Sequence, residues 1–478
     1  MIKDQQIMIG KSDKEIFLST KVLNRHGYIA GATGTGKTVT LKVLAESLSQ
    51  LGIPVFLADI KGDLSGLNIP GNKEGIASRL EKMGISDFET KGFPVAFWDV
   101  YGENGLSVRT TISEMGPIML AKLLGLNDIQ TAVLNVVFRV ADDNGWLVID
   151  IKDLRSLLIH IDENRSEISR EFGAVAPQTI AAIQRSLMQL EDQGGNFFFG
   201  EPSLNIMDWI RTDASGNGVI NILNSTKLFL SPQLYSTFLL WMLSELFEML
   251  PEAGDLDKPK IVFFFDEAHA LFKDTSKELQ QKIEQVVKLI RSKGVGIFFV
   301  TQNPADIPDE VLAQCSNRIQ HALRAYTPKE QKGMKAAAES FRENPLFDTL
   351  ETLGELETGQ ALVSFLDESG KPSMVEKTTI CPPQSSFDVL DSLAISRSVT
   401  SHPLYSTYSQ SIDRESAYEI LSAKLKENME KEVKSKPVGR QKKTFVQKTV
   451  DNTVNQFSRE IGRTIVRSIL GAIKGQFK

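Results

Sequence analysis

The sequence predicts an α/β fold built around a mainly parallel β-sheet, and three observations support this prediction. A Gly-rich segment at residues 31–38 separates a short apolar run at 27–30 from a stretch with helical spacing. Several other apolar runs are continuous rather than alternating, as expected for strands buried on both faces of a parallel sheet. Segments with helical periodicity separate many of these runs, as in repeated β-α-β units.

The predicted strands are rich in Val, Ile and Phe and are bounded by turn residues. In chain order they cover residues 27–30, 54–58, 94–98, 218–223, 261–265, 296–300, 318–323 and 361–365. Between residues 111 and 215 the periodicity is mostly helical instead. We therefore expect a first part of the core at 1–110, a mostly helical insertion at 111–215, and a second part of the core at 216–385.

The composition changes after residue 385, where we expect a linker and a charged helix at 386–434 and a basic amphipathic tail at 435–478. Residues 431–478 contain 12 Lys and Arg but 3 Asp and Glu, a net charge of +9. The whole chain carries −6, so the preceding residues carry −15. Such a tail favours binding to an anionic surface, either nucleic acid or a membrane. A protein partner is a further possibility for it. A solvated or self-associating helix is the alternative.

Composition also bounds the class of protein. The 41% of hydrophobic residues is ample for a large core. Two cysteines, Cys315 and Cys381, do not make a disulfide framework and indicate a reducing compartment. The N-terminus has no signal-peptide pattern, and the apolar stretch at 234–250 carries two glutamates, so we expect a buried helix there. These observations predict a soluble cytoplasmic protein. Two other residues, His26 and His269, lack metal-ligand spacing.

Residues 31–38 read G-A-T-G-T-G-K-T, which is the spacing of a phosphate-binding P-loop. Glycines allow successive N–H groups to point at one anion, and the following helix adds the positive end of its dipole. Lys37 can reach the β- and γ-phosphates, and the Thr38 hydroxyl can bind Mg²⁺. The motif therefore predicts that ATP and Mg²⁺ bind here. The predicted nucleotide-binding residues are Gly31, Thr33, Gly34, Thr35, Gly36, Lys37, Thr38 and Val39.

A second chemical signal is the acidic pair Asp266–Glu267 at the end of an apolar strand. Asp266 suits the Mg²⁺ shell, directly or through water. Glu267 is the natural group to orient and polarise an attacking water. An acidic pair at a strand end is common by itself, but together with the P-loop it predicts hydrolysis of a nucleoside triphosphate.

Two further residues are candidates for the same reaction. Gln302 follows the strand at 296–300 and could sense the γ-phosphate or position water, although strand-end amides are common. Arg291 lies just before that strand and could stabilise the γ-phosphate from a neighbouring subunit. Arg318 and Arg324 compete for this role, and an ordinary basic turn is the alternative.

Two other segments have open interpretations. Asp59 and Asp63 follow the second strand and could support the Mg²⁺ shell, or could cap a turn before a helix. The aromatic run at 196–200 could stack on nucleic-acid bases, but three adjacent aromatic residues are more often core or subunit packing.

Together these residues resemble the HerA–FtsK superfamily of ring-forming P-loop ATPases, and within it the YjgR-type branch of HerA-like proteins. The resemblance extends over about residues 5–385, and its narrower motifs lie in the insertion. The motifs that carry it are at residues 26–38, 59–66, 113–117, 198–202, 266–269 and 301–304.

The resemblance implies a RecA-like core, a homo-oligomer that is a hexamer, an ATP site between subunits, and an arginine finger that fits Arg291. It also implies action on DNA through a central channel. The segment before the P-loop is short, so we expect no N-terminal β-barrel of the archaeal type and no docking of a nuclease through one. The rival hypothesis is a nucleotide-gated scaffold or membrane-associated regulator whose tail binds anionic lipid or a partner protein.

Overall fold

The computed structural model describes residues 2–254, 256–273 and 277–435. The chain divides into two compact units, residues 1–421 and 422–478. Helix α16 (Ala417–Ser435) begins in the first unit and contains all the described residues of the second. Except for Ser435, the predicted basic tail at 435–478 lies outside the described residues. None of the described helices is long and apolar enough to cross a membrane.

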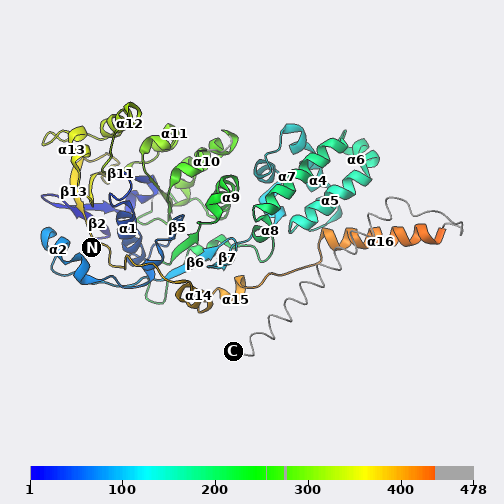
Figure 1. Ribbon diagram of the computed structural model, residues 1–478, viewed down its shortest axis with the longest axis horizontal. Coiled ribbons are helices and arrows are strands. Elements are labelled where there is room, and N and C mark those ends of the chain that lie inside the picture. The colour runs from blue at the N-terminus through cyan, green and yellow to red at the C-terminus, as the bar shows by residue number, and fades with distance from the viewer. Residues whose placement is uncertain (1, 255, 274–276, 436–478) are drawn as a thin grey trace. The chain divides into compact units, whose positions relative to one another are not determined.

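The described strands form one large mixed sheet whose greater part is parallel (Figure 1). The mainly parallel α/β fold predicted from the sequence is therefore confirmed. The parallel strands are, in spatial order, β11 (Asn317–His321), β4 (Gly27–Ala30), β10 (Val295–Thr301), β9 (Ile261–Phe265), β5 (Val55–Asp59), β8 (Ile220–Asn224), β6 (Val95–Asp99) and β7 (Leu106–Ser107).

The sheet continues beyond β11 as an antiparallel edge. Its strands are β12 (Gln360–Ser364), β13 (Glu376–Ile380), β2 (Gln6–Lys11), β1 (Ile2–Lys3) and β3 (Glu15–Ser19). Placing residues 361–365 in the parallel part of the sheet was wrong, because β12 runs antiparallel to β11. Almost all of β12 is buried, so its continuous apolar run has the same pattern as a parallel strand.

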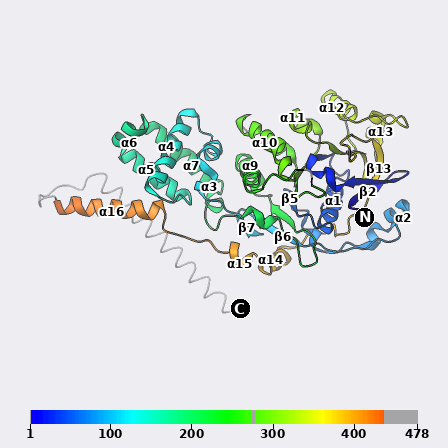
Figure 2. The same ribbon diagram turned by 180° about the vertical axis from the view of Figure 1, so that it is seen from behind.

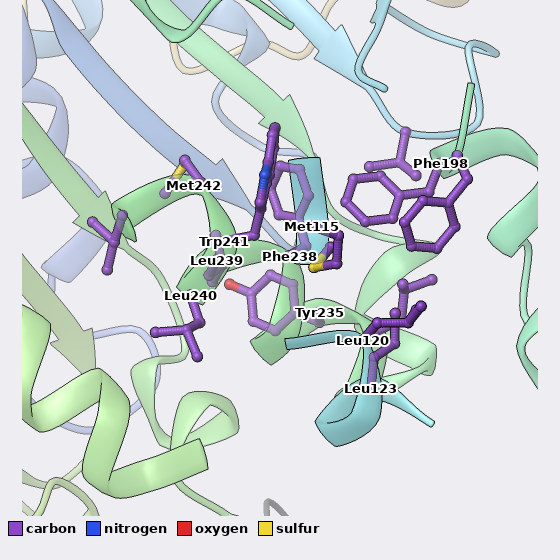
Figure 3. Packing of buried hydrophobic residues seen from close by; sticks show 14 of the residues in the cluster. Met115, Leu120, Leu123, Phe198, Tyr235, Phe238, Leu239, Leu240, Trp241 and Met242 are labelled. Atoms are coloured by element: carbon purple, nitrogen blue, oxygen red, sulfur yellow. The ribbon is translucent and has the colours of Figure 1, made fainter. Parts of the chain in front are cut away.

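Helices cover the sheet and its ends. The longest of them, α9 (Pro232–Met249), is the buried helix expected at 234–250, and its Tyr235, Phe238 and Trp241 are almost fully buried (Figure 3). The other helices around the sheet are α1 (Lys37–Gln50), α2 (Lys73–Met83), α10 (Lys277–Ile290), α11 (Asp309–Leu312), α12 (Pro328–Glu339), α13 (Thr349–Glu355), α14 (Ser392–Thr400) and α15 (Tyr405–Tyr408). Short 3₁₀ helices are η1 (Thr20–Arg25), η2 (Ser65–Asn68), η3 (Ile206–Trp209), η4 (Leu228–Leu230), η5 (Ala268–Leu271), η6 (Arg291–Lys293) and η7 (Pro304–Asp306).

A cluster of helices is inserted between β7 and β8 (Figures 1 and 2). Its two ends meet where Thr110 N–H donates to the carbonyl of Phe198 at 2.9 Å and the Ser203 hydroxyl donates to Glu114 at 2.9 Å. The family-like motifs at 113–117 and 198–202 therefore lie together at the neck of the insertion. The helices are α3 (Ile112–Leu123), α4 (Asp128–Asn144), α5 (Ile151–Glu163), α6 (Arg165–Phe172), α7 (Pro177–Asp192) and α8 (Gly195–Phe198).

The aromatic run at the neck is mainly a packing element. Phe198 is 0% and Phe199 3% exposed, and the Phe198 ring contacts Phe238 and Trp241 of α9. Figure 3 shows Phe198 beside this cluster. Only Phe197 is exposed, at 52%. The structure therefore favours core packing over a base-stacking platform, because two of the three rings are inaccessible to a base.

Helix α1, which follows the P-loop, carries two buried charges on the face that meets residues 384–386. The carboxylate of Glu46 accepts hydrogen bonds from the N–H groups of Gln384 at 2.7 Å and Ser385 at 3.0 Å. The Lys42 ammonium donates to the carbonyl of Ser386. Burial raises the pKa of Glu46 to about 7 and lowers the pKa of Lys42. A distant part of the chain thus holds α1 against the sheet.

Candidate nucleotide-binding site

The P-loop connects the end of β4 to the start of α1. Its first residues are fixed on both sides of β4, because Gly31 N–H donates to Thr301 at the end of β10 and Ala32 N–H donates to Ala322 just beyond β11. Gly34 and Gly36 have φ values of 77° and 117°, which are unfavourable for any other residue. The loop is therefore curled by its sequence and anchored by its neighbours.

The loop has the properties of an anion-binding cradle. Within the described residues, no group accepts a hydrogen bond from the N–H groups of Gly34, Gly36 or Lys37. These donors lie at the N-terminus of α1, where the helix dipole is positive. A Cβ placed on Gly34 would meet no atom within 4 Å, so the chain leaves open space there. Thr33 and Gly34 are exposed, whereas Thr38 and Val39 in the first turn of α1 are half-buried.

The Lys37 side chain folds back over the loop. Its ammonium donates to the carbonyls of Gly31 at 2.6 Å and Ala32 at 3.1 Å. Burial and the nearby charge of Lys61 lower the pKa of Lys37. The hydroxyl of Thr35 also donates within the loop, to Ala32 at 2.8 Å. The predicted phosphate-binding residues are thus gathered around one short loop.

The acidic pair lies two strands from the P-loop at the same edge of the sheet. Strand β9 ends immediately before Asp266, and β10 lies between β9 and β4 in parallel register. Both carboxylate side chains are buried, with exposed fractions of 10% for Asp266 and 9% for Glu267. Burial raises the pKa of Asp266, and the charge of Lys61 opposes this.

Three segments hold the Glu267 carboxylate. Its Oε1 accepts from the Lys61 ammonium at 2.8 Å, and its Oε2 lies 3.4 Å from both Gln302 Nε2 and His269 Nδ1. Although burial acts to raise the pKa of Glu267, its hydrogen bond and charge interaction with Lys61 lower it overall. An ionised carboxylate in this setting can accept a proton.

Glu267 also has a strained backbone, with φ 46° and ψ 48°. Non-glycine residues in the left-handed region store about 1 kcal/mol or more, and such residues concentrate at functional sites. The turn aims the Glu267 side chain across the ends of β10 and β5, where Gln302 and Lys61 contact it.

The loop after β5 is shaped by Asp59. Its carboxylate accepts from the N–H groups of Gly62 at 2.7 Å and Leu64 at 3.1 Å, and burial raises its pKa to about 7. Of the two interpretations of Asp59, these contacts favour the capped turn. The residue that this turn presents to the acidic pair is Lys61, which the sequence reasoning did not select.

The candidate arginines lie in different places. Arg291 is in η6, before β10, whereas the P-loop lies at the other end of the parallel strands. The seven residues of β10 span roughly 23 Å, so Arg291 cannot reach the P-loop of its own chain. Arg318 donates to the carbonyls of Cys315 and Ser340, and Arg324 to those of Gly354 and Leu356.

The residues fit Mg²⁺ bound together with a nucleotide. The Thr38 hydroxyl and the Asp266 carboxylate are the hard oxygen donors that Mg²⁺ prefers. Among the described residues, no group of three or more His, Cys, Asp or Glu side chains could hold a metal by itself. Phosphate oxygens and water would therefore have to complete the metal shell.

A buried histidine, His321, packs against the P-loop and α1. It was not identified from the sequence. His321 at the end of β11 donates from Nδ1 to the carbonyl of Gln360 at 2.8 Å, and its Nε2 accepts from the Thr40 hydroxyl of α1 at 2.8 Å. A Cβ on Gly31 would lie 2.5 Å from the His321 Cβ. Burial lowers the pKa of His321 to about 4.

His321→Asn should destabilise the protein more at pH 7.5 than at pH 5. In wild type, the unfolded chain binds a proton at His321 below its ordinary pKa of 6.5, but the folded chain does not until about pH 4. Stability from this histidine is therefore lost as the pH falls from 6.5 towards 4. The difference in unfolding free energy between wild type and variant should shrink by about 2 kcal/mol between the two pH values.

Urea denaturation at both pH values measures this difference. Thr40→Val removes the same hydrogen bond but keeps the titrating ring, so its difference from wild type should depend much less on pH. An equal pH dependence in the two variants would contradict a neutral buried His321.

Comparison with known proteins gives a family and a fold. A family model described as "Helicase HerA-like C-terminal" matches residues 4–478. A curated relative named "DNA double-strand break repair helicase HerA", from Sulfolobus acidocaldarius, is 22% identical over 371 residues, covering 75% of this chain and 66% of the relative. The alignment thus spans slightly less than two thirds of that relative's length.

Two solved structures share the fold. The plasmid coupling protein TrwB in complex with a non-hydrolysable GTP analogue has a TM-score of 0.56 at 14% identity, covering 82% of this chain and 92% of that one. TrwB in complex with ADP and Mg²⁺ has a TM-score of 0.53 at 15% identity, with coverages of 80% and 91%. At these identities the likeness shows a shared fold.

Proposed function

The chain belongs to the helicase HerA-like C-terminal family, and on this premise we propose that it is a Mg²⁺-dependent ATP hydrolase that works on DNA. We further propose that it acts as a homo-oligomeric ring, a hexamer, in the cytoplasm. The observation that carries the proposal is the Glu267 carboxylate, held by Lys61, Gln302 and His269 at the same sheet edge as an anion-binding P-loop. The narrower placement in the YjgR-type branch stays a prediction.

In this proposal the P-loop binds the ATP phosphates. The N–H groups of Gly34, Gly36 and Lys37 donate to the phosphate oxygens, and the Lys37 ammonium neutralises their charge. Thr38 and Asp266 would hold Mg²⁺. Bound there, the metal would neutralise charge that develops on the phosphate oxygens.

Glu267 activates the water. Its carboxylate accepts a proton from the water as the water oxygen bonds to the γ-phosphorus, and the bond from the γ-phosphorus to the bridging oxygen breaks. Gln302 is within reach of Glu267, so its amide can orient the same water. Arg291 would act on the site of a neighbouring subunit, because its own site is out of reach.

DNA is the proposed substrate surface because a relative is named as a DNA double-strand break repair helicase. We expect double-stranded DNA to increase the rate of ATP hydrolysis several-fold. Phosphate release with and without DNA measures this, and Lys37→Ala should abolish both rates because it removes a phosphate-binding charge.

The outcome distinguishes DNA from other partners. If neither single- nor double-stranded DNA changes the rate while anionic lipid vesicles do, the DNA proposal is wrong and the membrane-associated regulator is favoured. If Lys37→Ala retains the wild-type rate, the measured hydrolysis does not come from this site.

A further inference from the structure

The ammonium of Lys61 contacts both carboxylates of the acidic pair, Asp266 and Glu267, and acts as their counter-ion. It is 2.8 Å from Glu267 Oε1 and 3.6 Å from Asp266 Oδ2. Both carboxylates are about nine-tenths buried, whereas the Lys61 side chain is 41% exposed. Two buried neighbouring carboxylates repel each other and lose hydration. Keeping both ionised without a nearby cation would therefore destabilise the folded protein. Lys61 supplies the compensating charge from the solvent side.

The position of Lys61 is built into the loop after β5. Asp59 is 3% exposed and holds the loop through the N–H groups of Gly62 and Leu64. Gly62 has a φ of 74°, which permits the tight turn directly after Lys61. The loop therefore fixes the backbone of Lys61 beside the acidic pair, with its ammonium within reach of both carboxylates.

Two lysines already offset the two carboxylates of the acidic pair without any metal. Lys61 and Lys37 carry two positive charges, and both lie close enough to affect the ionisation of Asp266 and Glu267, which carry two negative charges. Asp63 adds a negative charge at longer range. A divalent ion entering alone would therefore add an excess of positive charge to a partly buried site. A nucleotide brings its own negative charge with the metal and removes that excess.

We propose that Lys61 is a positioning residue that occupies the cation position of the acidic pair until nucleotide binds, so that divalent metal enters with the nucleotide and not before it. This inference deepens the proposed function and rests on it for the identity of the metal site. Lys61 holds Glu267 in place and keeps Asp266 from binding metal in the empty enzyme.

The test measures metal binding to the full chain without nucleotide. Mn²⁺, followed by its electron paramagnetic resonance signal at pH 8, serves as the probe. Wild type should bind Mn²⁺ weakly, whereas Lys61→Met and Lys61→Gln should bind it about tenfold more tightly, because one repelling charge within about 4 Å is removed. Lys61→Arg should behave like wild type, because it restores the charge.

A double variant locates the metal. Lys61→Met combined with Asp266→Asn should lose the gained affinity. An unchanged or weaker Mn²⁺ affinity in both Lys61→Met and Lys61→Gln would overturn the inference, as would a gain that persists in the double variant.

The result is separable from the proposed function. The measurement needs no turnover, so a gain of Mn²⁺ affinity in Lys61→Met supports the role of Lys61 even if no hydrolysis is found. Conversely, suppose that wild type hydrolyses ATP faster with DNA while Mn²⁺ binding is unchanged in both uncharged variants. That result rejects the inference about Lys61 and leaves the proposed function in place.

Discussion

Glu267→Gln should lower the rate of ATP turnover by about 10³-fold and leave ATP affinity within about twofold of wild type. The amide keeps the size of the side chain and an oxygen that can accept from Lys61, so the surrounding structure should be retained. It cannot take a proton from water as a carboxylate does. The expected loss is therefore in the chemical step and not in binding.

Phosphate-release kinetics give the turnover number, and titration with a fluorescent ATP analogue gives the affinity. Glu252→Gln is a matched control, because Glu252 is exposed and pairs with Lys293 before β10. It should keep wild-type turnover. Turnover within tenfold of wild type for Glu267→Gln would exclude Glu267 as the general base.

Arg291→Ala should reduce turnover by about 10³-fold or more, which is the usual effect of removing an arginine that stabilises the transferred phosphoryl group. Arg291 lies at the edge of the sheet opposite its own P-loop, so we expect it to act on a neighbouring subunit. Lys288→Ala removes an exposed charge of α10 three residues earlier and should leave turnover unchanged.

Mixing the two inactive variants tests action between subunits. In a random equal mixture of Arg291→Ala and Glu267→Gln chains, about one quarter of the interfaces combine an intact Glu267 with an intact neighbouring Arg291. The rate of ATP hydrolysis should recover to about that fraction of the wild-type rate. The mass of the oligomer, measured in ATP and Mg²⁺, shows whether mixed oligomers have formed. No recovery in mixed oligomers, or a protein that remains monomeric, would reject Arg291 as a residue acting between subunits.

Much of the parallel sheet could be predicted because its strands are short, continuous and apolar. The runs at 54–58 and 261–265 correspond to β5 and β9 within one residue. The antiparallel strands β2, β3 and β13 were missed because β2 and β3 alternate or end in polar residues, and because β13 contains mostly Thr, Lys and Glu. Such strands depend on pairing with neighbours, which a local pattern does not reveal.

For the candidate site, the sequence indicates residues within recognisable motifs but not the contacts between distant segments. The P-loop was predicted from its spacing, and the acidic pair from its place at the end of an apolar strand. Lys61 was passed over in favour of its acidic neighbours, because only the fold brings it to Glu267 across 206 residues. His321 was missed for the same reason, since its partner Thr40 is 281 residues away. A lysine between two strand-end aspartates was the one signal that could have pointed to Lys61.

The contacts of α1 also limit how early during translation this helix can reach its final packing. Glu46 is paired by backbone groups that lie 338 and 339 residues later in the chain. At about 5–20 residues per second, the ribosome needs roughly 20–70 s to produce them. During that interval the Glu46 carboxylate lacks these two donors and has to be solvated by water instead. The helix that follows the nucleotide loop is thus synthesised well before the residues that pair its buried carboxylate.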